Sequence, residues 1–106
     1  MKLLKILAAS TLALAIASTT SFADVTKGQK AFIKFLKEPC GMDGAKFALK
    51  HTQAEWREIK ASGQGEAEII KICPNVKAGD VKEALIDHIM DFSIGFASDS
   101  GNVPAC

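Results

Sequence analysis

The sequence has few aromatic residues and no excess of either charge. It contains no tyrosine, one tryptophan and six phenylalanines among 106 residues, with 13 basic against 12 acidic side chains. Proteins that bind nucleic acids generally need exposed aromatic rings or an excess of Lys and Arg. The composition therefore excludes the common nucleic-acid-binding classes. Only three prolines and eight glycines are present, which excludes a collagen-like or low-complexity chain.

The sequence also lacks any stretch that alternates between apolar and polar residues for long enough to form a strand. Apolar residues recur instead at helical spacing, which predicts five helices. These cover residues 27–37, 44–50, a segment from Thr52 to the break at 62–65, then 66–72 and 80–97. A chain of this length holds one domain at most. We therefore expect an all-α fold, a small bundle of about five helices.

Several residues mark the ends of these helices. Thr52 and Glu55 have the spacing of a capping box, in which each side chain bonds a backbone N–H of the other residue. Asp80 is expected to cap the last and longest helix. Pro39 and Gly41 are expected to end the first helix, which places Cys40 in a turn.

Residues 1–23 have the pattern of a secretory signal peptide. Lys2 and Lys5 precede an uncharged apolar run over residues 6–17, and Ser21 and Ala23 place small residues at the positions that a signal peptidase requires. A membrane anchor is the alternative, but a spanning helix needs about 20 apolar residues. We expect cleavage after Ala23 and export to the periplasm. The mature chain would then be a single domain of residues 24–106 with a polar tail at 98–106 and no membrane association.

The charges of the mature chain are unevenly distributed. Residues 24–60 carry eight basic and five acidic side chains, whereas residues 61–106 carry three basic and seven acidic ones. The lysines of the first helix recur on one side, at Lys27, Lys30, Lys34 and Lys37, and are expected to form a solvated face. The asymmetry is either ordinary surface variation or a dipole that steers a partner protein.

No set of residues indicates an enzyme. The sequence shows neither a recognisable Ser-His-Asp order nor a Cys-His pair, and no glycine-rich phosphate loop follows a strand. The carboxylates are scattered, so no general acid and base pair is indicated. The two histidines, His51 and His88, are expected to be structural or solvated. We expect no catalytic residues.

Metal binding has only weak candidates. Cys40 and Met42 share a loop, and their soft sulfur atoms suit Cu(I). His88 and Met90 look like a copper-binding His-x-Met pair, but residues two apart on a continuous helix point about 200° away from each other. We expect no metal, with Cys40 and Met42 as the weak copper candidates.

The layout of the mature chain resembles a small class I cytochrome c. The segment from Lys27 to Phe32 is similar to the Lys-Gly-x-x-x-Phe opening of that family, and Cys40 stands where the first haem-attaching cysteine follows. Ile72-Cys73-Pro74 resembles the segment that supplies the axial methionine. The resemblance implies a fold in which the first and last helices cross, and a periplasmic protein that works with redox partners.

The haem-binding signature of that family is absent. The family attaches haem through Cys-x-x-Cys-His, but this chain reads Cys40-Gly41-Met42-Asp43-Gly44, and Cys73 replaces the axial methionine. We therefore expect no cofactor and no covalent haem, and a binding or accessory module for a periplasmic redox protein. The alternative is an electron or metal carrier with non-covalent haem or sulfur-bound copper. The apolar bulk that replaces the haem is expected from Phe35, Phe47 and Trp56.

The resemblance also implies two structural features. Gly28 and Gly95 would allow the first and last helices to approach closely, with Phe32, Phe92 and Phe96 packed around the crossing. Cys40 and Cys73 would both face the space that haem occupies, and both lie beside a proline where a helix ends, so a disulfide between them is expected. Bridges from either cysteine to Cys106 are the rival pairings.

The remaining thiol generates the first testable prediction. If Cys40 and Cys73 are joined, Cys106 is free or pairs with a second chain. Non-reducing gel electrophoresis of the exported protein should then show a dimer band that disappears with reductant and in a Cys106→Ser variant. A dimer band that persists in Cys106→Ser would show that another cysteine is responsible.

Overall fold

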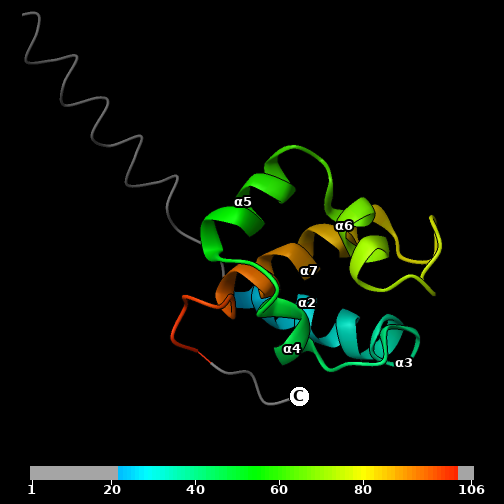
Figure 1. Cartoon of the computed structure of the whole chain (residues 1–106), viewed down its shortest axis with the longest axis horizontal. Helices are drawn as coiled ribbons and strands as arrows, with labels where there is room; N and C mark the ends of the chain where they lie inside the picture. The colour runs from blue at the N-terminus through cyan, green and yellow to red at the C-terminus, as the bar shows by residue number, and fades with distance from the viewer. Residues whose placement is uncertain (1–21, 103–106) are drawn as a thin grey trace, which may run out of the picture.

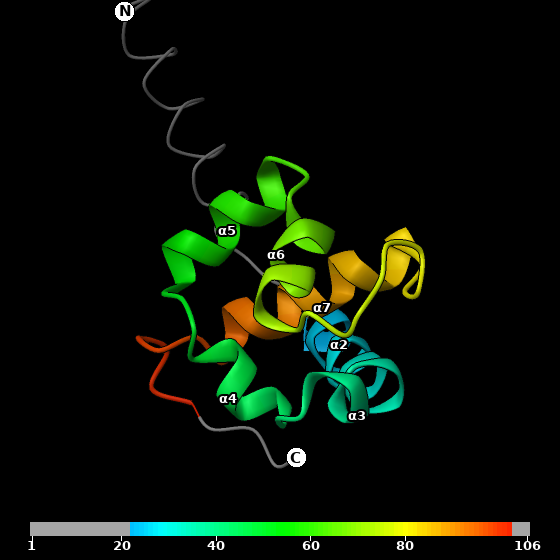
Figure 2. The same ribbon diagram turned by 45° about the vertical axis from the view of Figure 1, so that its right-hand side comes forward.

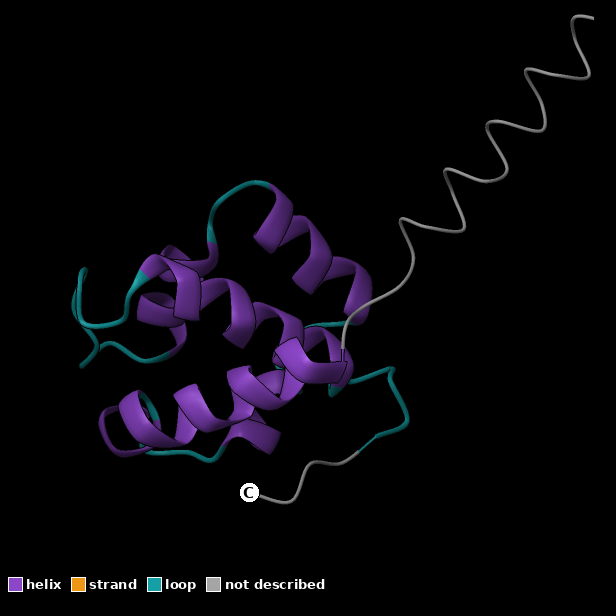
Figure 3. Ribbon diagram, turned by 180° about the vertical axis from the view of Figure 1, so that it is seen from behind, coloured by secondary structure: helices purple, strands orange, loops and turns teal. Residues whose placement is uncertain are grey.

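The computed structural model describes residues 22–102, with side chains from Asp24 onward. All regular elements in this range are helices, so the predicted all-α class is confirmed (Figures 1 and 3). They are α2 (Phe22–Phe35), α3 (Lys37–Cys40), α4 (Gly44–Ala48), α5 (Gln53–Ala61), α6 (Gly65–Ile72) and α7 (Glu83–Gly95). Within the described range, no helix combines the length and the apolar character that crossing a membrane would require.

The fold is built on the pairing of α2 with α7. These two longest helices lie side by side and run in opposite directions (Figure 1). As the chain passes around α7, helices α4, α5 and α6 each contact it (Figure 2). The sequence predicted this contact between the first and last helices. The remaining helices complete a single core around α7.

Gly28 lies where the two helices are closest. A Cβ atom at this position would overlap the backbone carbonyl group of His88 and would lie 2.7 Å from the Cβ of Phe92. A backbone atom in a helix cannot move aside as the end of a flexible side chain can. The absence of a side chain at Gly28 therefore sets the spacing of the α2–α7 pair.

Gly95 differs from Gly28, and the prediction that its missing side chain permits the close approach is wrong. A Cβ at Gly95 would lie 3.5 Å from the methyl carbons of Val25, which is an ordinary van der Waals contact. The predicted phenylalanines do surround the helix pair. Phe32 and Phe92 are fully buried with ring centroids 6.3 Å apart, and the partly buried Phe96 lies 5.2 Å from Phe92.

A second aromatic group continues the core from α2 towards α5. The rings of Phe47 and Trp56 are stacked at 5.3 Å, both side chains are fully buried, and Trp56 Nε1 donates a hydrogen bond of 2.9 Å to the carbonyl of Ala48. These two residues supply the apolar bulk that the sequence predicted. Phe35 does not, because it is 37% exposed and lines a surface groove instead of the core.

The helix ends follow from specific side chains. The Thr52 hydroxyl accepts from Glu55 N–H and a Glu55 carboxylate oxygen accepts from Thr52 N–H at 2.9 Å, so the predicted capping box is present. The pKa of Glu55 is held below its usual value, mainly because its carboxylate accepts the Thr52 backbone N–H and, to a smaller extent, because it interacts with the Thr52 hydroxyl.

The prediction that Pro39 ends the first helix and that Cys40 lies in a turn is wrong, because both residues belong to α3, which Gly41 caps in a left-handed conformation. The first helix instead ends at Phe35, whose carbonyl cannot accept a hydrogen bond from Pro39 because proline has no N–H.

The predicted start of the last helix at Asp80 is wrong. The Asp80 carboxylate accepts a hydrogen bond of 2.9 Å from the Lys77 N–H, so it closes a turn upstream. Lys82 is extended, caps α7 without a side-chain bond, and precedes the first helical residue, Glu83. Asp80 therefore stabilises the loop that leads into α7.

Hydrogen bonds hold the described part of the polar tail, residues 98–102, against the start of α5 and the end of α7. Ser98 N–H donates to the carbonyl of His51, Asp99 accepts from the N–H of Gln53, and Asn102 Nδ2 donates to the carbonyl of Gly95. The Asp99 bond satisfies one of the free N–H groups at the start of α5. The predicted signal peptide, residues 1–23, lies outside the described residues except at positions 22 and 23, where α2 begins, and Cys106 also lies outside them.

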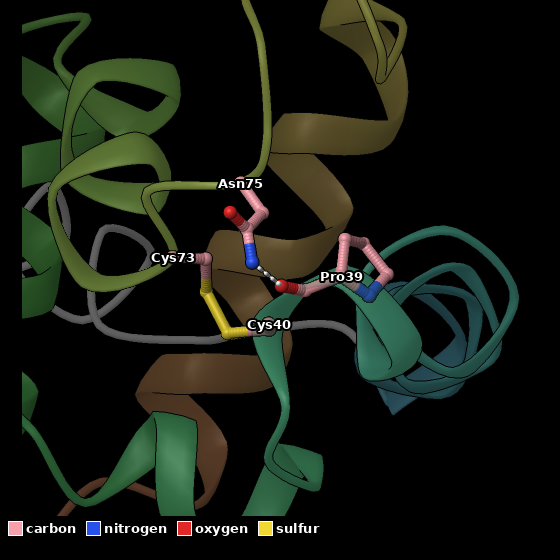
Figure 4. The surroundings of a disulfide bond; sticks show 4 residues. All are labelled: Pro39, Cys40, Cys73 and Asn75. Atoms are coloured by element: carbon pink, nitrogen blue, oxygen red, sulfur yellow. Dashed lines mark hydrogen bonds between the residues drawn. A yellow bond between two sulfur atoms is a disulfide. The ribbon is translucent and has the colours of Figure 1, made fainter.

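The structure contains the expected disulfide between Cys40, the last residue of α3, and Cys73, which follows α6 (Figure 4). Their Cα atoms are 4.6 Å apart, and Cys73 is fully buried. Beside the bridge, Asn75 Nδ2 donates a hydrogen bond of 3.4 Å to the carbonyl of Pro39. The loop that joins α6 to α7 is therefore held against α3 by one covalent bond and one hydrogen bond.

The contrast between the two glycines can be tested directly. Gly28→Ala should lower the free energy of unfolding by roughly 1–3 kcal/mol or more, because the helices must separate to admit the methyl group. Gly95→Ala is the matched control. Alanine has a higher helix propensity than glycine, by up to about 1 kcal/mol, which should offset any loss in the free energy of unfolding at this position. Urea unfolding measures both. A Gly28→Ala protein as stable as Gly95→Ala would contradict the close approach.

The disulfide should account for a large share of the stability. It closes a loop of 33 residues, which corresponds to about 3–4 kcal/mol in chain-entropy estimates. Reductant should therefore lower the thermal midpoint of the wild-type protein but leave that of a Cys40→Ala/Cys73→Ala double variant unchanged. Cys106→Ala is the control and should respond to reductant as the wild type does. Finding a free thiol at Cys40 by peptide mapping would exclude the bridge.

Candidate functional site: a lysine-lined groove

A surface groove runs between α2 and the segment that leads into α7. Its volume is about 730 Å³, and we call it the lysine groove. It is lined by the following residues: Lys27, Lys30, Ala31, Lys34, Phe35, Gly79, Asp80, Lys82, Leu85 and His88. The groove combines a charged rim with an apolar floor.

The basic rim follows from the helical repeat of α2. Lys27, Lys30 and Lys34 are three and four residues apart, so their side chains project from one face of the helix. The extended residue Lys82 supplies a fourth ammonium group from the opposite side of the groove. The lysine face predicted from the sequence is thus exposed, and three of its members border a concave surface.

The floor of the groove is apolar. Ala31, Phe35 and Leu85 lie between the lysines, and Phe35 is one of only three large hydrophobic side chains exposed among the described residues. The Lys34 Nζ lies 5.2 Å from the centroid of the Phe35 ring. An aromatic ring in a groove lined by lysines can make apolar contact with a partner while the lysines bind the partner's carboxylates.

The electrostatic balance within the groove is strongly positive. The groove is lined by four lysines and one carboxylate, that of Asp80, and this carboxylate accepts the Lys77 N–H. Groups of like charge around a low-dielectric surface attract a partner of opposite charge and raise its rate of association. The arrangement therefore suits an anionic surface with an apolar centre.

The weak copper candidates do not form a site in this oxidised protein. Cys40 is bonded to Cys73, so it has no thiolate to offer a metal, and the partly buried Met42 packs against the core. Cys40 and Met42 therefore offer no pair of free sulfur ligands while the disulfide is formed. His88 and Met90 point apart as predicted, since Met90 is fully buried while His88 is partly exposed.

His51 has the structural environment that the sequence predicted. Its Nε2 lies 2.9 Å from a carboxylate oxygen of Glu68, and its ring meets the ring of Trp56 edge-on at 4.8 Å. It joins the segment before α5 to α6. His88 lies elsewhere, at one end of the lysine groove, with its Nδ1 3.5 Å from a carboxylate oxygen of Asp24.

Sequence reasoning missed the groove because half of its lining comes from a distant segment. The lysine spacing in α2 was visible, as was the presence of Phe35 among those lysines. The pairing with residues 79–85 depends on the disulfide and on the bond from Gly79 N–H to the Glu66 carboxylate, which positions the loop. An aromatic residue on an otherwise lysine-rich helix face was the signal that could have indicated a concave surface there.

Comparison with known proteins adds no relative to this description. No known protein family, curated protein or solved structure matches the chain.

Proposed function

We propose that this protein is an exported, haem-free binding module that docks an acidic redox partner through the lysine groove. The observation that carries the proposal is the rim of four lysines around an exposed aromatic floor. Rim charges steer and orient a partner, and the apolar centre supplies contact area once the two surfaces meet.

The packing of the core supports the haem-free form of the proposal. In a cytochrome c the haem plane takes up the centre of the core, where this chain has large side chains with no exposure. The fully buried set includes Trp56, Phe32, Phe47, Leu36, Ile69 and Met90. The disulfide joins the two positions at which the cytochrome resemblance would place a haem thioether and an axial ligand. Side chains and a covalent link thus take over the structural role of the cofactor.

The alternative proposal is a carrier with non-covalent haem or sulfur-bound copper. A filled core leaves a haem only surface grooves, and the Cys40 sulfur is already bonded. Both features favour the binding module. A visible absorption spectrum of the exported protein distinguishes the two proposals, because bound haem gives a Soret band and the binding module gives none.

Docking through the groove can be tested by site-specific cross-linking. Phe35 is replaced by the photoreactive analogue p-benzoyl-phenylalanine, which keeps an aromatic ring on the groove floor, and the producing cells are irradiated. We expect adducts with acidic redox proteins. In a Lys30→Glu/Lys34→Glu background the yield should fall about tenfold, which corresponds to about 1.4 kcal/mol of binding free energy.

The matched control reverses two lysines outside the groove. Lys46 and Lys50 are exposed and do not line it, so Lys46→Glu/Lys50→Glu makes the same change in net charge elsewhere. Adduct yield in this control should stay near that of the parent protein. Docking through the groove would be contradicted if the adduct yield fell equally in both double variants, or if it fell in neither.

A further inference from the structure

Three potential metal ligands converge where the start of α2 meets the middle of α7. Asp24 comes from α2, and His88 and Asp91 come from α7; one ligand atom from each lies within 4.8 Å of the other two. The Nδ1 atom of His88 is buried and has no hydrogen-bond partner. Its neighbour is the Asp24 Oδ1 at 3.5 Å, beyond good hydrogen-bonding distance. A buried nitrogen that lies near two carboxylates and has no partner can be satisfied in two ways. It can form a hydrogen bond, or it can bind a cation together with the carboxylates.

The convergence is a consequence of the close approach at Gly28. Asp24 precedes Gly28 by four residues, so both lie on the face of α2 that meets α7. His88 and Asp91 are three residues apart and share one face of α7. Because the helices are nearest where Gly28 meets the His88 carbonyl, the side chains one turn away are brought together.

We propose that Asp24, His88 and Asp91 bind a divalent transition-metal ion such as Zn²⁺. One imidazole nitrogen and two carboxylate oxygens are donors that zinc accepts, at about 2.0–2.2 Å. Tetrahedral ligands at that distance are about 3.4 Å from one another. The 3.5 Å between His88 Nδ1 and Asp24 Oδ1 already has this spacing. Small rotations of the side chains would close the remaining separation, so the backbone need not move.

Lys60 is the competitor for this site. Its Nζ lies 2.7 Å from Asp91 Oδ1, where it holds one oxygen of the carboxylate. The Lys60 side chain is 38% exposed, whereas that of Asp91 is only 10% exposed. A metal ion would therefore bind the remaining Asp91 oxygen or displace a lysine that can move into solvent. Removing the ammonium group should strengthen metal binding.

The expected cleavage after Ala23 would add a fourth donor. Asp24 would then be the first residue, and its α-amino group and side-chain carboxylate can close a six-membered chelate ring on one ion. The three side chains carry the proposal without this group, whereas the chelate rests on the predicted cleavage position. The binding site would then be completed by processing of the exported chain.

Calorimetric titration of the exported protein with ZnCl₂, after treatment with a chelator, tests the site. A Cys106→Ser variant is used so that no free thiol binds zinc. We expect one Zn²⁺ per chain, an affinity at least tenfold lower in His88→Gln and in Asp24→Asn, and a higher affinity in Lys60→Met. Circular dichroism verifies that each variant is folded, and Asp24→Asn keeps the test decisive should His88→Gln fail to fold.

His51→Gln is the matched control, because His51 also lies beside two carboxylates, those of Glu55 and Glu68. This variant should bind zinc as the parent does. In NMR spectra that report the imidazole nitrogens, zinc should shift the His88 signals and leave those of His51 in place. The proposal is overturned if no stoichiometric binding is seen, if the folded Asp24→Asn protein binds zinc unchanged, or if the His51 signals shift instead. These outcomes do not depend on docking at the lysine groove.

Discussion

The structure depends on how closely α2 and α7 approach each other at Gly28. With a side chain at this position the helices could not keep their present spacing, since the Cβ would overlap the His88 carbonyl. That spacing buries Phe32 and Phe92 between the helices and aligns Asp24 with His88. It also determines where the lysine-bearing face of α2 lies relative to Leu85. The core, the groove and the cluster of potential ligands therefore share one geometric cause.

The interior of this small domain is filled by large, fully buried side chains. Aromatic contacts continue from Phe92 through Phe32 and Phe47 to Trp56, and the indole N–H is satisfied by a backbone carbonyl. Each of these four side chains is fully buried. Aromatic residues bury large areas with few rotatable bonds, so a few of them stabilise a domain of this size efficiently. Four of the seven aromatic residues in the sequence thus lie in the core.

Much of the fold could be predicted from local sequence, and the exceptions have identifiable causes. The helical repeats and the Thr52–Glu55 capping box are local, and each appears in the structure. Asp80 was assigned to the wrong partner because an aspartate before a helix can bond the backbone of its own turn as well as the helix N-terminus. Phe35 was assigned to the core because its spacing from Phe32 does not show which face another element covers.

The candidate sites were harder to predict, because each joins segments far apart in the chain. Neither the groove nor the Asp24–His88–Asp91 cluster has a continuous motif, and the exposed and buried sides of His88 are distinguishable only once α2 is in place. The disulfide can be expected from the sequence, since three cysteines permit few pairings. Which two cysteines pair is not determined by their spacing alone, because it also depends on how the helices are arranged.

The disulfide divides the chain topologically. The covalent ring of residues 40–73 contains α4, α5 and α6, whereas α2 and α7 lie outside it on either side. The two helices that form the centre of the core are thus the segments that precede and follow a covalently closed loop. Closing that loop shortens the path between these segments from the whole intervening chain to a few residues on each side of the bridge. Reduction of the bridge would therefore lengthen the chain that must be ordered before α2 and α7 can pack together.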